Sequence, residues 1–539
     1  MQKKHIVLRN IPKHFNLLSC LIFCLATLLT SCSPSPKSDK STLIHGRGGD
    51  SVGLDPGLET DGESLKVIEN IYSKLVSFEE GTTKIIPDLA AKWTISDDGL
   101  QYDFYLRKNV FFHDNTEVDA DAVVFSLERQ RDPEHPYHKI GSANWQYWLA
   151  MGMNKIVKKV SKVDKYHVRI FLNFPETPFI ANLAMPFCAI VSPTAANRLK
   201  EKFNFNPVGS GPFKFKKWVK NQIVELEAFD KYYGGRPKID RLIYKSIPDN
   251  SSRFLEMMAG KLDVLEFPNP SDVPQLAANQ KLKIIKQEGM NIAYLAMNTQ
   301  KKPFDNKKVR QAVNYAINKK AIVDNMYEGL GKVAKNPMPP VIWSYNDAVK
   351  DYPYNPAKAK ALLKEAGLSK GFESKLWAIP IPRPYMPNGR KVAEAIQANL
   401  ADVGIKISLV SYEWGTYLDK TSRGEHSMAM LGWTGDNGDP DNFLYLLLGK
   451  ESAKIPAQNL AFFENEAVND LLTKAKRVTQ QSERDKLYRK AQLLIHEEAP
   501  WVPIAHSMIV VPVKKEVQNV KIDPTSGSVL YHKVWIDKK

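Results

Sequence analysis

Cysteine is scarce in this chain. Its 539 residues include four cysteines, and Cys188 is the only one beyond position 32. Once the N-terminal segment is removed, Cys188 has no partner for an internal disulfide, so stability has to come from a large core. Cys188 lies in the apolar stretch Met-Pro-Phe-Cys-Ala-Ile. This setting favours a buried, inert thiol over a catalytic nucleophile.

Long hydrophobic runs are also missing. The most apolar stretch, Leu17–Leu29, is shorter than the roughly 20 residues that a membrane-spanning helix needs. Because basic residues precede it, it predicts an export signal over residues 1–31. These basic residues are Lys3, Lys4, Arg9 and Lys13.

The end of this signal, Leu29-Thr30-Ser31-Cys32, resembles the lipobox of bacterial lipoproteins. The resemblance implies that Cys32 is lipidated and becomes the first residue of the exported protein. We therefore expect a periplasmic or extracytoplasmic protein held at a bacterial membrane. The polar, proline-broken residues 32–42 are expected to form its tether.

The usual catalytic templates do not fit. Gly46-Arg-Gly-Gly-Asp-Ser begins like a dinucleotide fingerprint, but Ser51 stands where the third glycine belongs. His496 opens a zinc-protease-like motif, yet Pro500 replaces its second histidine. No P-loop occurs either. We therefore expect neither an enzyme nor a bound cofactor.

The formal net charge is +16, but the lysines are scattered along helix-like segments. A basic chain of this kind does not predict nucleic-acid binding, which needs a concentrated patch or stripe. Attraction to an anionic membrane or cell wall is the better interpretation.

The hydrophobic pattern predicts a mixed α/β protein. Short β-rich runs dominate up to about residue 288, and from about residue 291 amphipathic helices alternate with short strands. One helix is expected to begin at Asn355-Pro356 and end at Gly367. Another is expected between a cap at Asp305 and a stop at Gly329. Its apolar face holds Val309, Ala312, Val313, Ala316 and Ile317.

An acidic, glycine-rich turn follows a short strand-like run. Leu431–Phe443 reads Leu-Gly-Trp-Thr-Gly-Asp-Asn-Gly-Asp-Pro-Asp-Asn-Phe. A calcium loop counted from Asp436 would need glycine at its sixth position and glutamate at its twelfth, but Asp441 and Leu447 stand there. No metal site is therefore predicted. A carboxylate for an organic cation and a carboxylate that caps a turn remain open.

Several segments resemble the peptide-class (family 5) solute-binding proteins of ABC importers, over residues 43 to the C-terminus. The likeness is greatest to the dipeptide-binding members. The segments are Asp88-Leu-Ala-Ala-Lys-Trp, Gly209-Ser-Gly-Pro-Phe, Pro303-Phe-Asp-Asn-Lys-Lys-Val-Arg, Asn336-Pro-Met-Pro-Pro, Trp377-Ala-Ile-Pro-Ile-Pro-Arg-Pro-Tyr and Leu431–Phe443.

The resemblance implies a bilobed α/β fold, like periplasmic binding proteins of type II, with an additional subdomain in the N-terminal half. Lobe I is expected to comprise residues 43–75, 195–290 and 506–539, and the extra subdomain residues 76–194. Lobe II is expected over 291–505. Strands near residues 292–298 and 501–507 would form the hinge, and the C-terminus would return to lobe I.

The same resemblance implies a peptide site. Asp436 matches the aspartate that pairs with the α-amino group of the ligand, and Arg383 matches the arginine that takes its carboxylate. A guanidinium fits a carboxylate with two parallel hydrogen bonds. Because each extended residue adds roughly 3.3–3.6 Å, a fixed separation would select short peptides. Asp439 and Asp441 are expected only to shape the turn.

Further contacts are expected around this ion-pairing site. Trp433 and Tyr385 would wall the pocket, with Thr434 and Gly435 beside them. Gly48 and Ser51 would supply hydrogen bonds from lobe I.

The implied partners are a short peptide, the membrane permease of an ABC importer and the membrane itself. The protein is expected to be a monomer. Two features depart from the dipeptide-binding pattern: a glycine-richer stretch near Arg47 and the lack of cysteines after Leu448. A haem-binding, nickel-complex-binding or oligopeptide-binding member therefore stays open.

Overall fold

The computed structural model describes residues 41–140, 145–525 and 529–537. The predicted export signal and Cys32 lie outside these ranges. Thr42, expected in the tether, already belongs to the first strand, β1 (Thr42–Arg47). Every helix in the described ranges is too short or too polar to span a bilayer.

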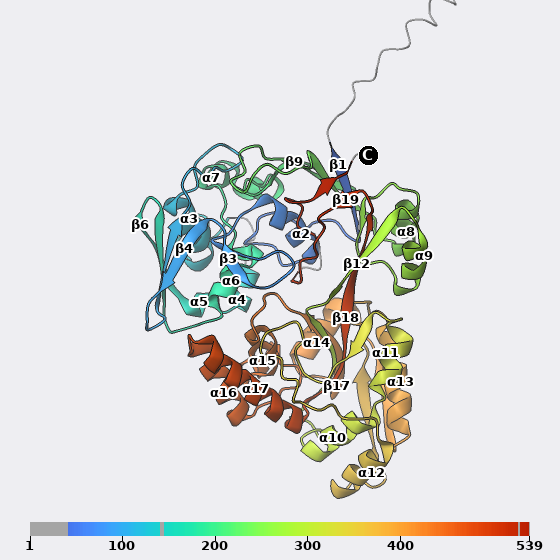
Figure 1. The fold of residues 1–539 in the computed structure, drawn as a ribbon. Helices are drawn as coiled ribbons and strands as arrows, with labels where there is room; N and C mark the ends of the chain where they lie inside the picture. The colour runs from blue at the N-terminus through green and yellow to red at the C-terminus, as the bar shows by residue number, and fades with distance from the viewer. Residues whose placement is uncertain (1–40, 141–144, 526–528, 538–539) are drawn as a thin grey trace, which may run out of the picture. The chain divides into compact units, whose positions relative to one another are not determined.

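Twelve strands of the described residues join into one sheet that passes through both lobes (Figure 1). Its main path is β16-β15-β17-β13-β18-β11-β1-β10-β9-β8, and β12 and β14 pair with β18. The strands in lobe I, besides β1, are β8 (Phe213–Val219), β9 (Ile223–Ala228), β10 (Arg241–Ser246), β11 (Val264–Leu265) and β12 (Leu282–Glu288). Those in lobe II are β13 (Asn291–Met297), β14 (Gly331–Val333), β15 (Phe372–Trp377), β16 (Ile405–Val410) and β17 (Met428–Thr434).

Strand β18 (Trp501–Lys514) connects the two lobes. Its first half pairs antiparallel with β13 and β14, and its second half pairs with β12 from Met508 to Lys514. After residue 507 the chain therefore pairs with β12, a strand of the predicted lobe I. A second crossing joins β12 to β13 between Glu288 and Asn291. These crossings adjoin the predicted hinge strands, and their role as a hinge stays a prediction.

The extra subdomain has a sheet and a core of its own. Its sheet runs β4-β5-β7-β6. Phe104, Val123, Trp148 and Ile170 lie in its core, as does Cys188, whose thiol pKa is raised by burial. Its strands are β2 (Val76–Phe78), β3 (Ile85–Pro87), β4 (Ala90–Ile95), β5 (Gln101–Leu106), β6 (Val157–Asp164) and β7 (His167–Leu172). Its helices are α3 (Ala120–Arg131), α4 (Gln146–Ala150), α5 (Met153–Ile156), α6 (Phe179–Leu183) and the 3-10 turn η1 (Pro186–Cys188).

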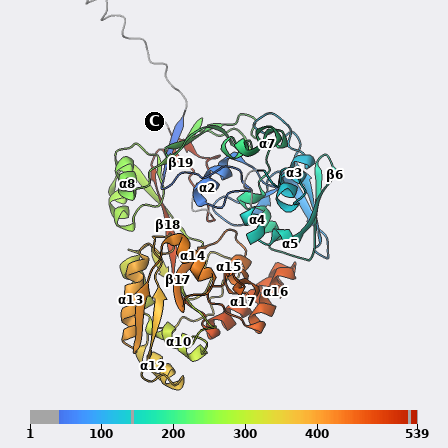
Figure 2. The ribbon, with the colours of Figure 1, turned by 180° about the vertical axis from the view of Figure 1, so that it is seen from behind.

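Helices cover the sheet in both lobes, as the two views show (Figures 1 and 2). The helices of lobe I are α2 (Gly62–Ile71), α7 (Pro193–Leu199), η2 (Lys200–Phe205), α8 (Asn250–Met258), η3 (Pro270–Asp272) and α9 (Val273–Ala278). Lobe I also has two short strands, β19 (Val517–Gln518) and β20 (Trp535–Ile536). The helices of lobe II are α10 (Lys307–Ala316), α11 (Lys319–Met326), α12 (Pro356–Glu365), α13 (Gly389–Ala401), α14 (Trp414–Ser422), α15 (Asp441–Leu448), η4 (Glu451–Ala453), α16 (Glu466–Arg477) and α17 (Gln481–Glu498).

The helix predicted from Asn355 is confirmed, and the one predicted from Asp305 is wrong in two respects. Asn355 caps α12 by accepting a hydrogen bond from the Lys358 N–H, and Gly367 follows the helix with a φ of 76°. In the other segment Asn306, not Asp305, caps α10. That helix ends at Ala316, because the backbone turns to an extended conformation at Ile317 and Asn318 caps a separate helix, α11.

Candidate functional site

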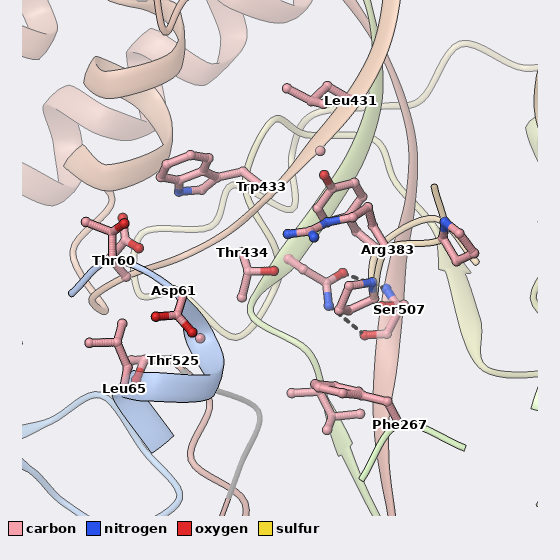
Figure 3. A pocket seen from close by; sticks show the side chains of 18 of the residues that line it. Thr60, Asp61, Leu65, Phe267, Arg383, Leu431, Trp433, Thr434, Ser507 and Thr525 are labelled. Atoms are coloured by element: carbon pink, nitrogen blue, oxygen red, sulfur yellow. Dashed lines mark hydrogen bonds between the residues drawn. The ribbon is translucent and has the colours of Figure 1, made fainter. Parts of the chain in front are cut away.

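A cavity of about 1130 Å³ lies between the two lobes and the extra subdomain. This volume is slightly above the roughly 300–1,000 Å³ of typical small-molecule sites. Lobe II contributes the end of β17 and the proline-rich segment around Arg383, and lobe I contributes the start of α2 and the segment around Phe267. Tyr147 and Phe187 of the extra subdomain complete the wall. Figure 3 shows Asp61, just before α2, across the cavity from Thr434 and Trp433.

Asn442 in the first turn of α15 holds the acidic turn in place. Its Oδ1 accepts hydrogen bonds of 2.9 Å from the Asp436 backbone N–H and from Nε1 of Trp433. Its Nδ2 donates to Oδ2 of Asp436 at 3.2 Å. Because β17 ends at Thr434, this one amide fixes the carboxylate two residues beyond a central strand.

Tyr147 reaches Asp436 from the extra subdomain. Its hydroxyl donates a hydrogen bond of 3.2 Å to Oδ1 of Asp436. Burial raises the pKa of Asp436 to about 6, although the hydrogen bonds from Asn442 and Tyr147 act in the opposite direction. Within the described residues no cationic side chain forms an ion pair with Asp436. The cavity wall therefore presents a carboxylate that lacks a counterion.

The two other carboxylates of the turn are engaged within the protein. Asp439 is buried and receives two hydrogen bonds from Arg484, at 2.7 and 2.8 Å. Asp441 lies 3.9 Å from Nζ of Lys476, and burial raises its pKa to about 7. Neither lines the cavity. Asp439 does more than shape the turn, because its ion pair ties the turn to α17.

Arg383 lies on the cavity wall between Pro382 and Pro384. Its backbone exchanges two hydrogen bonds with Met386, at 3.1 and 2.9 Å, which holds the turn. The guanidinium carbon is 5.4 Å from the centre of the Trp414 ring and 6.0 Å from that of Tyr385, within reach of cation–π attraction. No carboxylate of the described residues pairs with it, and its buried Nε has no hydrogen-bond partner.

The predicted aromatic neighbours line the cavity. Trp433 and Tyr385 both do so, as does Thr434. Tyr385 packs so closely on β17 that a Cβ at Gly432 would lie 2.2 Å from its ring. Gly435 does not line the cavity: a Cβ there would lie 2.7 Å from the Phe443 ring, so its glycine serves the packing of the turn.

Gly48 and Ser51 also lie away from the cavity lining. The Ser51 hydroxyl accepts a hydrogen bond from Nη1 of Arg47 at 3.1 Å and donates to the Glu63 carbonyl at 3.3 Å. It is thus engaged in fixing its own loop. The lobe I wall comes instead from Thr60, Asp61 and Gly62, about ten residues further along.

Sequence reasoning missed Asp61, Tyr147, Trp414 and Asn442. Asp61 carries a local signal, because an aspartate before a helical pattern is typical of an N-cap, and it caps α2 by accepting a hydrogen bond from the Ser64 N–H. Asn442 stands in the Leu431–Phe443 motif, but nothing in the motif indicates its contacts with Asp436 and Trp433. For Tyr147 and Trp414 no local pattern indicates a site, since they meet Asp436 and Arg383 only through the tertiary fold.

The arrangement suits the binding of a charged ligand. No cluster of three or more metal-ligating side chains occurs in the described part of the chain. The cavity instead offers an anionic group, a cationic group and aromatic walls. Such a site can hold a small zwitterion by its two charges.

Comparison with known proteins gives a consistent result. The model of the bacterial extracellular solute-binding proteins, family 5 (middle), matches residues 84–454. A dipeptide-binding protein of Escherichia coli is 43% identical over 495 residues, which cover 90% of this chain and 92% of that protein. Heme-binding protein A of Haemophilus influenzae is 42% identical over 93% of this chain and 94% of its own length.

A solved structure is similar across both lobes. It is the ABC transporter-associated periplasmic binding protein DppA from Helicobacter pylori in complex with the peptide STSA. It superimposes with a TM-score of 0.80 at 42% identity and covers 93% of this chain and 99% of its own. The likeness confirms the bilobed α/β fold.

Proposed function

The chain belongs to the bacterial extracellular solute-binding proteins of family 5, and from this membership we propose that it captures short peptides for an ABC importer. Asp436 would pair with the α-amino group of the peptide and Arg383 with its carboxylate. Trp433 and Tyr385 would pack beside the backbone of the peptide. The relatives in this family are transport proteins, not enzymes, and binding without chemical change fits the cavity.

One observation carries the proposal. Two groups of opposite charge, Asp436 and Arg383, line the same cavity, and neither has a counterion among the described residues. Charged groups withdrawn from water are costly unless they are paired. A zwitterionic peptide would supply both missing partners at once.

The proposal extends to the cellular setting. Export and lipidation of Cys32 would hold a monomer at the outer face of a membrane, close to a permease that receives the closed, loaded form. Hinge closure is known for periplasmic binding proteins. Here it would bring lobe II against lobe I and the extra subdomain around the ligand.

Calorimetry with Gly-Leu tests the proposal. Asp436→Asn and Arg383→Met should each weaken binding by about 2–5 kcal/mol, because each leaves one ligand charge buried without a partner. Asp249→Asn, at the exposed N-cap of α8, is a matched control that should bind as the wild type does. Unchanged affinity in both site variants would overturn the proposal.

The haem-binding relative suggests haem as an alternative ligand of the cavity, and an absorption spectrum with haemin tests this alternative. The cavity lining includes neither histidine nor cysteine among its described residues, so axial ligation by those side chains is not favoured. Titration with haemin should leave its Soret band as it is in buffer. A shifted, saturating band that Gly-Leu displaces would favour haem as the ligand.

A further inference from the structure

Acidic groups outnumber basic groups on the cavity wall when the side chains that already form ion pairs within the protein are left out. Lys66 pairs with Glu63 at 3.0 Å and with Glu266 at 2.8 Å. Glu69 pairs with Lys74 at 2.7 Å, and Asp419 pairs with Arg423. Of the described lining residues, Asp61, Asp436 and Arg383 then remain without an ion pair. Two carboxylates thus face one guanidinium.

Asp61 uses one of its two carboxyl oxygens to cap α2. Its Oδ1 accepts a hydrogen bond of 2.9 Å from the Ser64 N–H as the N-cap of α2. A negative charge at this position is favoured by the helix dipole. No N–H or hydroxyl group of the described residues donates to its Oδ2, although the carboxyl group of Glu59 interacts with this side chain. Figure 3 shows the side chain on the lobe I wall, opposite Trp433 and Thr434.

Asp61 and Asp436 line the same cavity, and Asp61 lies across from Thr434, two residues before Asp436. The hydroxyl of Tyr147 is hydrogen-bonded to Asp436, and its pKa is raised well above the ordinary value, chiefly by the Asp436 charge, with a further contribution from Asp61. Asp61 also helps to raise the pKa of the neighbouring Glu59 to about 7, after the larger effect of burial. The surplus negative charge is therefore at the end of the cavity where the peptide amino group would be.

A peptide with uncharged side chains matches Asp436 and Arg383 but leaves Asp61 without a counterion. A peptide whose first residue is lysine or arginine supplies the third charge, and it does so beside the amino group. We propose that Asp61 determines specificity in this site by pairing with a cationic side chain on the first residue of the peptide. This inference rests on the proposed peptide-binding function and goes beyond it in naming the preferred ligand class.

Calorimetry with three dipeptides tests the inference. The wild type should bind Lys-Ala about tenfold more tightly than Gln-Ala, because a charge-assisted hydrogen bond replaces a neutral one. Ala-Lys, with the cation on the second residue, should bind about as Gln-Ala does. In Asp61→Asn the ratio between Lys-Ala and Gln-Ala should fall to about one, because the charged partner is gone while asparagine still caps the helix.

Asp249→Asn serves as the control, because Asp249 caps α8 in the same way and does not line the cavity. It should keep the full preference for Lys-Ala. The inference is overturned if Asp61→Asn still prefers Lys-Ala, or if the wild type shows no preference for Lys-Ala. In either case, binding of Gln-Ala would still support the proposed function. An equal loss for Lys-Ala and Gln-Ala in Asp61→Asn also overturns it, because Asp61 would then serve every peptide alike. A wild type that binds none of the three overturns the proposed function itself.

Discussion

The hydroxyl of Tyr147 donates a hydrogen bond to the Asp436 carboxylate although the two residues lie 289 positions apart. The contact joins the extra subdomain to the turn after β17. Its consequence is electrostatic, since the hydrogen bond lowers the pKa of Asp436 against the larger, opposite effect of burial.

Peptide affinity should therefore depend on pH through Asp436, whose pKa is about 6 without ligand. Below that pH the carboxyl group is protonated and loses its attraction for the ligand ammonium, which stays charged. The affinity for Gly-Leu should fall about tenfold per pH unit below 6. In Tyr147→Phe the pKa of Asp436 rises, so the fall should begin at a higher pH. Calorimetry from pH 4.5 to 8 measures both profiles, and coincident profiles would contradict this role of Tyr147.

The same carboxylate should lower the stability of the ligand-free protein. Its folded-state pKa is raised from 3.8 to about 6, so folding favours the protonated form. The penalty is absent below about pH 4, grows between pH 4 and 6, and is complete above pH 6. Asp436→Asn should thus raise the free energy of unfolding at pH 7.5 by about 1–3 kcal/mol, and the gain should vanish near pH 4.

Denaturant melts of the ligand-free protein measure this gain. Asp249→Asn is an informative control because the pKa of Asp249 is lowered by hydrogen bonds from Ser252. Its ionised form is favoured by folding, so its replacement should not stabilise the protein at pH 7.5. A less stable Asp436→Asn variant at pH 7.5 would contradict the prediction.

The sequence predicts local features of the fold well. Asn355, Pro356 and Gly367 are cap, first-turn and stop signals that act within a few residues, and α12 has those bounds. The segment after Asp305 shows the limit. The apolar face through Ile317 continues the helical period, but Asn318 caps a new helix. The sequence pattern is compatible with one long helix and with two short ones, and the packing of α10 and α11 against the sheet decides for two.

The site is predictable only in part, for a similar reason. Asp436 and Arg383 stand in recognisable segments, and both line the cavity. Asp439 gave no sign of its partner, because Arg484 is 45 residues away and only the packing of α17 brings it close. Asp61 and Tyr147 likewise depend on how the lobe I wall and the extra subdomain close over β17. Their binding roles, and that of Arg383, stay predictions.

Arg383 should recognise the peptide carboxylate through its planar guanidinium. Arg383→Lys keeps the charge but loses the paired hydrogen bonds, so binding of Gly-Leu should weaken by about 1–3 kcal/mol. A C-terminally amidated Gly-Leu lacks the carboxylate and should bind weakly and about equally to wild type and variant. Calorimetry on wild type and variant, each with Gly-Leu and with its amide, gives the coupling energy between Arg383 and the peptide carboxylate. A variant that weakens both ligands equally would show that Arg383 acts on the cavity structure instead.

The buried pair of Arg484 and Asp439 should be important for stability. Arg484 donates both Nη groups to Asp439 and its Nε to the Ala475 carbonyl at 2.8 Å. Lysine cannot make this set of bonds, so Arg484→Lys should lower the free energy of unfolding by about 2–4 kcal/mol. Arg489→Lys on the same helix only weakens an exposed pair with Asp485 and should change the free energy of unfolding by less than about 1 kcal/mol. Equal effects in urea melts would contradict the assignment.

Lys476 should hold the closed form together. On α16 of lobe II, its Nζ lies 2.9 Å from Glu176 of the extra subdomain, and its carbonyl accepts a hydrogen bond of 2.7 Å from the Thr177 N–H. Lys476→Met leaves Glu176 buried without a cation only while the lobes are closed, because opening would return Glu176 to water. The open form should thus gain population, and Gly-Leu should dissociate about 10–100 times faster.

Lys474→Met is the matched control, since Lys474 is an exposed lysine on the same helix. It should leave the dissociation rate unchanged in stopped-flow measurements. Small-angle scattering of the loaded protein adds an independent reading, because only Lys476→Met should increase the radius of gyration. If Lys476→Met speeds dissociation without that increase, Lys476 acts on the Asp441 side of the turn and not on closure. The cross-lobe contact with Glu176 would then not control how fast the ligand leaves.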